Sequence, residues 1–504
     1  MSNAWKVLCA SLLLVAALVA LLVWRPGSAP DDTSGAPLVL YCAAGVKPPV
    51  EAIAREYGKA YGVEVQLQYG GSGTLLANIQ VARAGDLYVA ADAGYAEAAR
   101  RKDLVAEIIP MAWQRPVIAV AKGNPRKILT TQDLLRDDVR VALGSPDAAA
   151  VGKLTRDIFQ RSGEWDKLER HVKEKGVFKP TVPEVANDVK LHTVDAGIVW
   201  DSTVSQYPEL EAVRVPAFEN EKSHIAICVL TSCRQPSRAL RFARYMTARD
   251  RRLLTFKGLG YDVVEGDAWA EHPEIVLFSG GVNRVAIEQT VKAFELREGV
   301  TVITNYKGCG LLVGEMKTGK HPDAYFACDT SYMKEVEPLF LDTSTISETD
   351  MVLLTEKGNP KNLRTLGDLT RPGVKVAVAN PSYSALGGLT RRLLDEAGLY
   401  EAVKANITYG DSPTADYLTV RVKTGREDVA IVYRANTVNL KGELEVIPIE
   451  HAAAKAIQPI AVGKESKHRQ LMGRLVDAIK SAESRKRFET SGFRWLAGEP
   501  PSHE

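Results

Sequence analysis

The stretch LQYGGSGTLLANI, residues 67–79, places three glycines around one serine and then continues in a pattern typical of a helix. Backbone N–H groups at the start of a helix are unpaired and carry the positive end of its dipole, so they attract anions. Glycines let the backbone approach a ligand closely, and Ser72 can cap the helix or donate its hydroxyl. Taken alone, the stretch is equally well explained as a glycine-rich turn with a serine cap.

Other functions that use glycine-rich loops need a different spacing. The stretch has neither the G-x-x-x-x-G-K-[ST] pattern of a phosphate-binding loop nor the G-x-G-x-x-G pattern of a dinucleotide site. A nucleophile elbow, G-x-S-x-G, would need a glycine where Thr74 stands. The histidines show no metal-ligand spacing. We therefore expect no enzyme, no metal centre and no cofactor.

The chain repeats itself. LVLYCAAG at residue 38 aligns with IVLFSGGV at residue 275, and a shift of 237 then pairs Gly71 with Gly308 and Asp92 with Asp329 without a gap. Later segments keep the order at shifts of 235 and 233. The sequence therefore predicts a tandem duplication, with a first domain at 38–265, a hydrophilic junction and a second domain at 275–499.

Each copy alternates strand and helix patterns. In the first copy an apolar strand at 38–43 precedes a helix with Val50, Ile53, Ala54 and Tyr57 on one face. An alternating strand, the glycine-rich loop, a second helix and a strand at 86–91 follow. This order predicts an α/β fold with parallel sheets covered by helices.

The amino-terminal segment indicates export. An 18-residue run without charge, 7–24, predicts that residues 1–25 form a signal peptide or membrane anchor, and we favour an uncleaved transmembrane helix. Residues 26–37 would be a tether, and the domains would be periplasmic or extracytoplasmic. The net charge of +2 shows no basic stripe, which argues against nucleic acid. The five cysteines after Cys9 have no paired spacing and are interpreted as core residues.

Several motifs in each copy resemble the type II periplasmic solute-binding proteins, most closely the molybdate-binding family. The first copy has GVEVQLQYGGSGTLLANI, GDLYVAAD, KGNP, GSPDAAAVGKLT and DAGIVW, and the second has GVTVITNYKGCGLLVGEM, PDAYFACD, KGNP, ANPSYSALGGLT and DVAIVY. The resemblance implies two doubly wound α/β lobes per copy, joined by a hinge. They would close on a small oxyanion such as molybdate or tungstate and deliver it to the permease subunit of an ABC transporter.

The resemblance also implies ligand-binding positions in both copies. In the first copy they are Gly45, Gly71, Ser72, Ala148, Ala149, Val182 and Trp200, and in the second Val282, Cys309, Tyr383, Ser384, Ala415 and Tyr433. Lys47 and Arg284 occupy matching positions and would each supply a cation, or would be solvated charges on a first helical turn. Asp92 and Asp329 are interpreted as structural, because a carboxylate repels an anion.

This sequence departs from the family at several of these positions. The first copy has Gly45 and Trp200 where hydroxyl-bearing residues are usual, and the second has Val282 and Cys309 in place of serines. Because thiols donate hydrogen bonds weakly, the identity of the anion stays open. The alternatives are a ferric-iron or other type II binder, and a sensor or scaffold with one degenerate pocket.

Overall fold

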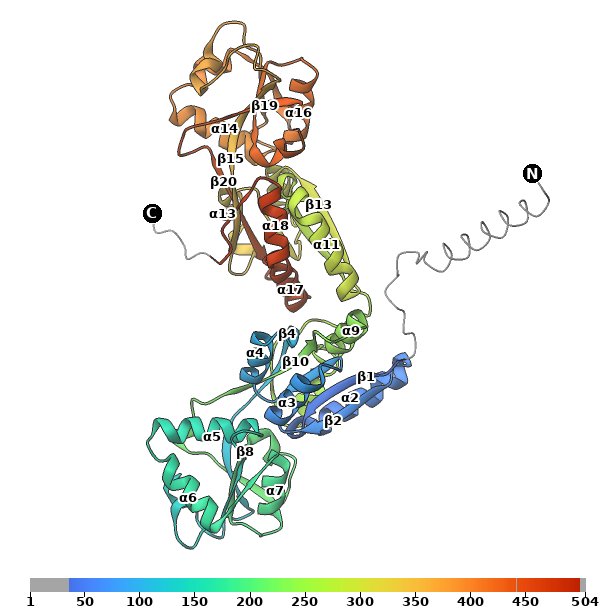
Figure 1. Ribbon diagram of the computed structural model, residues 1–504, viewed down its shortest axis with the longest axis vertical. Helices are drawn as coiled ribbons and strands as arrows, with labels where there is room; N and C mark the ends of the chain where they lie inside the picture. The colour runs from blue at the N-terminus through green and yellow to red at the C-terminus, as the bar shows by residue number, and fades with distance from the viewer. Residues whose placement is uncertain (1–35, 441, 499–504) are drawn as a thin grey trace, which may run out of the picture.

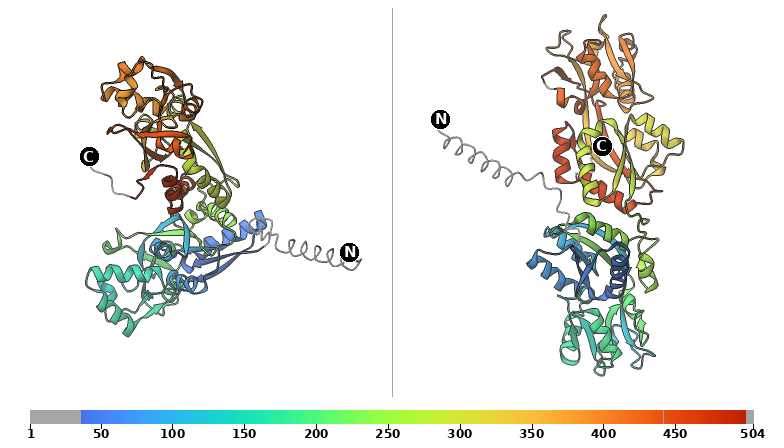
Figure 2. Two further views of the ribbon diagram at one scale, coloured as in Figure 1. Left: turned by 45° about the horizontal axis from the view of Figure 1, so that its top comes forward. Right: turned by 90° about the vertical axis from the view of Figure 1, so that its right-hand side faces the viewer.

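Four α/β lobes lie in a row along the long axis of the molecule (Figure 1), and the two further views in Figure 2 show the same elongated arrangement. The computed structural model describes residues 36–440 and 442–498. The first half of the chain forms two lobes, here called the first unit, and the second half forms the second unit. In each unit the lobe beside the other unit is called the inner lobe, and the terminal one the outer lobe.

The inner lobe of the first unit is a six-stranded sheet covered by helices. Its strands, in spatial order, are β11 (Asp262–Val263), β4 (Val105–Gln114), β10 (Ser223–Leu230), β3 (Leu87–Ala90), β1 (Leu38–Ala43) and β2 (Val65–Gly70). Its helices are α2 (Lys47–Tyr61), α3 (Ser72–Ala82), α4 (Ala93–Arg101), α9 (Pro236–Met246) and α10 (Leu253–Gly258), with a 3₁₀ turn η1 (Ala44–Val46). The central strands β1 and β3 are almost entirely buried, as expected for a sheet covered on both faces.

The outer lobe of the first unit is a five-stranded sheet. Its strands, in spatial order, are β7 (Val177–Lys179), β6 (Val141–Gly144), β8 (Ala196–Trp200), β5 (Pro116–Ala121) and β9 (Leu210–Val213). Its helices are α5 (Ala150–Arg161), α6 (Trp165–Lys175), α7 (Val182–Lys190) and α8 (Asp201–Val204), with 3₁₀ turns η2 (Gln132–Leu135) and η3 (Pro216–Phe218). The chain enters this lobe through Arg115 and leaves it between β9 and β10, so two crossings form the hinge.

The second unit repeats this plan around one long strand. Its strands are β12 (Glu274–Gly280), β13 (Thr301–Lys307), β14 (Ala324–Phe326), β15 (Ser344–Glu356), β16 (Val376–Ala379), β17 (Ile407–Ser412), β18 (Val429–Tyr433), β19 (Leu444–Pro448), β20 (Lys455–Val462) and β21 (Arg494–Trp495). Strand β15 pairs with β20 in the inner lobe and with β18 and β19 in the outer lobe, which joins both lobes into one ten-stranded sheet.

The helices of the second unit follow the same division. The inner lobe has α11 (Arg284–Glu298), α12 (Cys309–Lys317), α13 (Thr330–Lys334), α17 (Arg469–Ile479) and α18 (Ala482–Thr490), with η4 (Gly281–Asn283) and η5 (Glu337–Leu339). The outer lobe has α14 (Ala385–Glu396), α15 (Tyr400–Lys404) and α16 (Ala415–Lys423), with η6 (Leu366–Thr370) and η7 (Arg434–Leu440).

The duplication extends to strand register. Leu38 pairs with Val65 in the first unit, and Ile275 pairs with Val302 in the second, each partner displaced by the same shift seen in the sequence. The helices that follow, α2 and α11, both have 15 residues and end at a left-handed glycine. Glycine is favoured there because a side chain strains this backbone conformation. The predicted α/β fold of two tandem units is confirmed.

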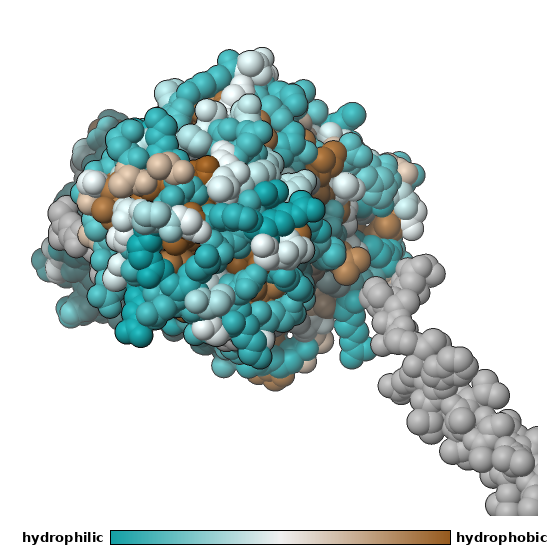
Figure 3. All heavy atoms as spheres, turned by 90° about the horizontal axis from the view of Figure 1, so that it is seen from above, coloured by the Kyte–Doolittle hydropathy of each residue, from teal (hydrophilic) through white to brown (hydrophobic). Residues whose placement is uncertain are grey.

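The predicted membrane helix cannot be compared with the structure. Residues 1–25, and the tether up to residue 35, lie outside the described residues. Among residues 36–440 and 442–498, no helix combines the length and the apolar composition needed to cross a membrane. The end-on view of the second unit's outer lobe in Figure 3 shows scattered apolar residues and no continuous apolar face on that side.

The two units are joined by a buried cluster of charges at the inner lobes. Glu298, at the end of α11, is 2% exposed and accepts hydrogen bonds from Arg244 of α9 at 2.9 Å and from Arg474 of α17 at 2.6 Å. Burial alone would raise the pKa of Glu298, but the two guanidinium groups outweigh it and hold that pKa below its usual value. Such a cluster costs desolvation and depends on every partner being present.

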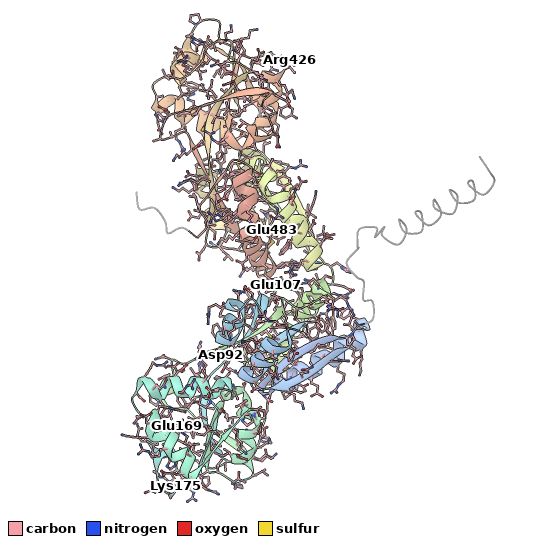
Figure 4. The ribbon with its side chains drawn as sticks, viewed as in Figure 1. Asp92, Glu107, Glu169, Lys175, Arg426 and Glu483 are labelled. Carbon is pink, nitrogen blue, oxygen red and sulfur yellow. The ribbon has the colours of Figure 1, made fainter. Side chains whose placement is uncertain are left out.

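Two further contacts extend this junction. Asp267, in the segment between the units, accepts hydrogen bonds from the backbone N–H groups of Gln470 and Leu471 at 2.8 and 2.9 Å, and so caps α17. Glu107 of β4, labelled at the junction in Figure 4, pairs with Arg297 of α11. The connecting segment is therefore tied to the second unit through the Asp267 carboxylate. It is tied to the first unit through the Asp267 carbonyl, which accepts the Arg249 N–H at 3.0 Å.

Replacing Glu298 tests this junction. We expect Glu298→Ala to lower the free energy of unfolding of the 36–498 fragment by about 3–5 kcal/mol, because Arg244 and Arg474 lose a buried partner. Urea denaturation measures the change. The matched control is Glu288→Ala on the same helix. Its carboxylate lies at the surface and is screened by solvent, so this change should leave the free energy of unfolding close to that of the parent. Equal effects of the two changes would contradict a structural role for the buried cluster.

Candidate ligand site between the lobes

A narrow crevice separates the inner and outer lobes of the first unit. Its volume is about 20 Å³, room for about one water molecule. The lining residues are Ala43, Ala44, Gly45, Gly70, Gly71, Ser72, Ala91, Ala149, Ala150, Val151, Thr181, Val182 and Trp200. None of them carries a formal charge. Of the seven first-copy positions carried over from the resemblance, six line the crevice, and Ala148 lies just beside it.

Helices from both lobes begin at this crevice. Ser72 is the first residue of α3 and Gly45 lies in the turn η1 that leads into α2, both in the inner lobe. From the outer lobe, Ala150 is the first residue of α5 and Val182 the first of α7. The positive ends of several helix dipoles therefore converge on one small space, which favours a negatively charged ligand without any formal cation.

The lobes of the first unit meet through their backbones. The Gly73 N–H donates to the Ala148 carbonyl of the outer lobe at 2.9 Å. A Cβ atom on Gly71 would lie 2.3 Å from the Ala148 oxygen and 2.5 Å from the Pro180 oxygen, closer than atoms can approach. Gly71 and Gly73 are therefore required for closure of the lobes, and Ala148 contributes a carbonyl to that contact.

Ser72 is the hydroxyl of the crevice best placed to donate. Its side chain is buried, and its Oγ accepts the Ala91 N–H at 3.2 Å. The Tyr88 hydroxyl donates to the Ser72 carbonyl at 2.9 Å and fixes the backbone of the turn. A serine hydroxyl can accept and donate at the same time, so Ser72 can donate its proton to a ligand while it accepts the Ala91 N–H.

The remaining walls of the crevice are apolar. Trp200, at the end of β8, is 1% exposed, and Val182 packs so closely on Gly45 that a Cβ there would lie 2.7 Å from the valine Cγ1. The Thr181 hydroxyl lines the crevice but donates to Glu184 at 2.6 Å. An anion in this space would depend on Ser72 and on backbone N–H groups.

The second unit closes in the same way. A Cβ on Gly308 would lie 2.2 Å from the Tyr383 oxygen and 2.7 Å from the Pro413 oxygen of the outer lobe. Cys309 begins α12, Ser384 precedes α14 and Ala415 begins α16, so helix starts again converge. Val282 and Tyr433 are buried, whereas the Tyr383 side chain is 42% exposed.

The two cations at matching positions lie outside the crevice lining. Lys47 is exposed, and its ammonium group lies over the Tyr69 ring, 4.7 Å from the centroid. Arg284 lies over the matching Tyr306 ring at 5.5 Å and pairs with Glu288. Each cation is therefore held on its own inner lobe by a cation–π contact, and Lys47 does not line the first crevice.

Asp92 and Asp329 are structural, as the sequence suggested. Asp92 accepts hydrogen bonds from the Gly94 N–H at 2.8 Å and from the Ser223 hydroxyl at 2.7 Å, and it caps α4. Figure 4 labels Asp92 near the boundary between the two lobes of the first unit. Asp329 accepts the Ser331 N–H at 3.0 Å and caps α13. Both carboxylates are engaged with their own lobes.

Sequence reasoning missed two features of the crevices. Thr181 lines the first crevice, and its T-x-x-E spacing to Glu184 could have indicated a helix start there. Cys309, a predicted ligand-binding position, lies beside Cys328, because the Cys328 N–H donates to the Cys309 sulfur at 3.1 Å. The two cysteines match Ser72 and Ala91 in the repeat, but no signal in the sequence shows that they are in contact. The described residues include no cluster of three or more His, Cys, Asp and Glu side chains suited to a metal ion.

Two lobes closing on a crevice at helix starts form a clamshell binding domain, and this chain contains two of them in tandem. The family model of the bacterial extracellular solute-binding proteins matches residues 38–257 and again residues 275–494. The chain belongs to this family. The match covers both units, so the second unit belongs to the family as well.

Individual relatives include transport proteins. The molybdate-binding protein ModA of Mycobacterium tuberculosis is 28% identical over 224 residues, which cover 44% of this chain and 84% of the relative. A putative binding protein of Haemophilus influenzae is 31% identical over 172 residues, 34% of this chain and 69% of the relative. Among solved structures, the substrate-binding domain of a putative molybdenum ABC transporter from Clostridium difficile aligns with 21% identity and a TM-score of 0.35, covering 45% of this chain and 99% of that one.

Replacing the closing glycines tests the closed arrangement. We expect Gly71→Ala or Gly308→Ala to hold the affected unit open, because the added methyl group would overlap carbonyl oxygens of the opposite lobe. Small-angle X-ray scattering of the 36–498 fragment should show a larger radius of gyration for each variant. Gly314→Ala, within α12 and with no atom near the added Cβ, is the matched control and should leave the curve unchanged. An unchanged curve for Gly71→Ala would refute the closed geometry.

Proposed function

We propose that this protein is an extracytoplasmic solute-binding protein whose first unit captures a small tetrahedral oxyanion, of the molybdate or tungstate type, for an ABC transporter. The observation that carries the proposal is the convergence of helix starts from both lobes on the Ser72 hydroxyl. The molybdate-binding relatives support the same class of ligand. The partners would be the anion, a permease subunit and the cytoplasmic membrane through the amino-terminal segment.

Neutral donors suit a doubly charged anion that must be released again. A buried cation would attract the anion strongly at any stage of closure, whereas dipoles and N–H groups act only when the lobes bring them together. The nearby Asp92 carboxylate is already satisfied by a backbone N–H and by Ser223. The crevice therefore offers attraction at short range with little repulsion from its surroundings.

Loading would require the lobes to separate. The present crevice holds about one water molecule, and a tetrahedral ion with four oxygens is larger. The two crossings at Arg115 and between β9 and β10 would allow a hinge motion, and the Gly73 to Ala148 hydrogen bond is an interlobe contact that opening would break. The bound state would then resemble a slightly wider form of the arrangement described here.

A panel of anions tests this proposal directly. In the 36–498 fragment, the accepted ion among molybdate, tungstate, sulfate and phosphate should stabilise the protein by about 2.7 kcal/mol at a hundredfold excess over its Kd. This stabilisation corresponds to a rise in Tm of roughly 5 to 11 °C for a domain of this size. Differential scanning calorimetry measures it. If none of the four ions raises Tm, the proposed function is wrong.

Removing one hydroxyl tests the site itself. Ser72→Ala should weaken binding of the accepted ion about 10- to 150-fold, because a charge-assisted hydrogen bond contributes about 1.5–3 kcal/mol. Isothermal titration calorimetry measures the Kd. Ser162→Ala is the control, since this hydroxyl donates to the Phe159 carbonyl at the far end of α5. Unchanged affinity in Ser72→Ala would place the anion elsewhere.

A further inference from the structure

The second crevice contains two thiols in place of the serine and alanine of the first. Cys309 and Cys328 are both buried and free, and a Cβ built on Gly280 would lie 2.9 Å from the Cys309 sulfur and 2.0 Å from the Cys328 sulfur. The two sulfurs are therefore no more than 4.9 Å apart, the sum of those distances. Sequence spacing alone gives no sign of this pair, because 19 positions separate the two residues.

The surroundings of the second thiol are adapted to it. Gly280 at the end of β12 pairs with Lys307, and Ala43 at the end of β1 pairs with Gly70. Gly280 and Ala43 are therefore equivalent positions, and the second unit has a glycine where the first has an alanine. Cys328 in turn stands where the first unit has Ala91. The sulfur of Cys328 lies in the space that a Cβ at position 280 would need. The larger side chain and the missing methyl group thus compensate each other.

Hydroxyl groups without partners lie around the two sulfurs. Tyr325 and Tyr433 are 0% and 3% exposed, and among the described residues neither hydroxyl has a hydrogen-bond partner of normal geometry. Both are close enough to Cys309 and Cys328 to interact with them electrostatically. In the first unit, by contrast, the matching Tyr88 hydroxyl donates to the Ser72 carbonyl. Both hydroxyls can therefore donate to negative charge carried by the two sulfurs.

The surroundings of Cys309 favour negative charge on its sulfur. The Cys328 N–H donates to that sulfur at 3.1 Å. Cys309 also begins α12, where the helix dipole stabilises a thiolate. The Asp329 carboxylate nearby is occupied by Ser331 and Ile457.

We propose that the second unit binds one soft monovalent metal ion, Cu(I) or Ag(I), between the sulfurs of Cys309 and Cys328. Soft thiolate ligands select such ions. With metal–sulfur distances of about 2.3 Å, as in zinc thiolates, two sulfurs on opposite sides of the ion stand about 4.6 Å apart. The upper bound set by Gly280 permits this separation. Both thiol protons pass to solvent as the ion binds, and the resulting singly negative S–metal–S group accepts the hydrogen bonds of Tyr325 and Tyr433.

A disulfide between the same residues fits the site less well. Its sulfurs are neutral and accept hydrogen bonds weakly, so the two tyrosine hydroxyls would stay without partners. The inference rests on the proposed function in one respect only, because the second unit must open as a clamshell to admit the ion. It does not require the first unit to bind an oxyanion.

Silver ion is the probe for this site. The 36–498 fragment with Cys233→Ser, which removes the partly exposed cysteine of the first unit, is fully reduced, desalted and titrated with Ag(I) in excess glutathione. Glutathione competes for any single thiol, so only a two-sulfur site retains the ion. We expect one equivalent of silver per chain and a higher Tm. No silver retained by the reduced fragment would overturn the inference.

Two variants identify the ligands. Cys309→Ser and Cys328→Ala, which each restore the residue type of the first unit, should bind silver at least a hundredfold more weakly while keeping the circular dichroism spectrum of the parent. Undiminished binding in both would refute the site. The anion panel is measured on the Cys233→Ser parent fragment. If that parent fails to retain silver but responds to an anion, only this inference is rejected, and if it retains silver but responds to no anion, only the proposed function is rejected.

Discussion

The structure of each unit depends on the close approach of one glycine turn to the carbonyl oxygens of the opposite lobe. In the first unit Gly71 and Gly73 meet Ala148 and Pro180, and in the second Gly308 meets Tyr383 and Pro413. No residue with a Cβ can occupy the sites of closest contact without moving a backbone. Because the lobes meet through their main chains, the helices that start at these turns are brought together, and the crevice acquires its attraction for negative charge.

On this shared framework the two crevices have diverged. The first retains the Ser72 hydroxyl, whose oxygen accepts the Ala91 N–H, together with apolar walls from Val182 and Trp200. The second replaces that serine and its alanine neighbour by two thiols, and a glycine in the adjacent strand makes room for the added sulfur. The buried cluster of Arg244, Glu298 and Arg474 holds the two units together, so one chain carries two differently equipped clamshells.

Much of the fold could be predicted from the sequence, because the repeat fixes equivalent positions and hydrophobic periodicity fixes the elements. The strand predicted at 38–43 and the helix face of Val50, Ile53, Ala54 and Tyr57 agree with β1 and α2. The residues of the ligand site were harder to predict from the sequence. Lys47 and Arg284 follow the first loop in the sequence, yet neighbouring tyrosine rings hold them away from the crevice. The Cys309 and Cys328 contact depends on strand register, which spacing along the chain does not reveal.

The central claim is that the first crevice, with neutral donors alone, is the anion site. Diffraction from crystals of the 36–498 fragment grown with tungstate tests it most directly, because tungsten scatters anomalously and marks its own position. The account predicts one anomalous peak per chain, between the starts of α3, α5 and α7 and within hydrogen-bond distance of the Ser72 hydroxyl. A tungsten peak outside that crevice, or an empty crevice in crystals that hold tungstate elsewhere, would contradict it.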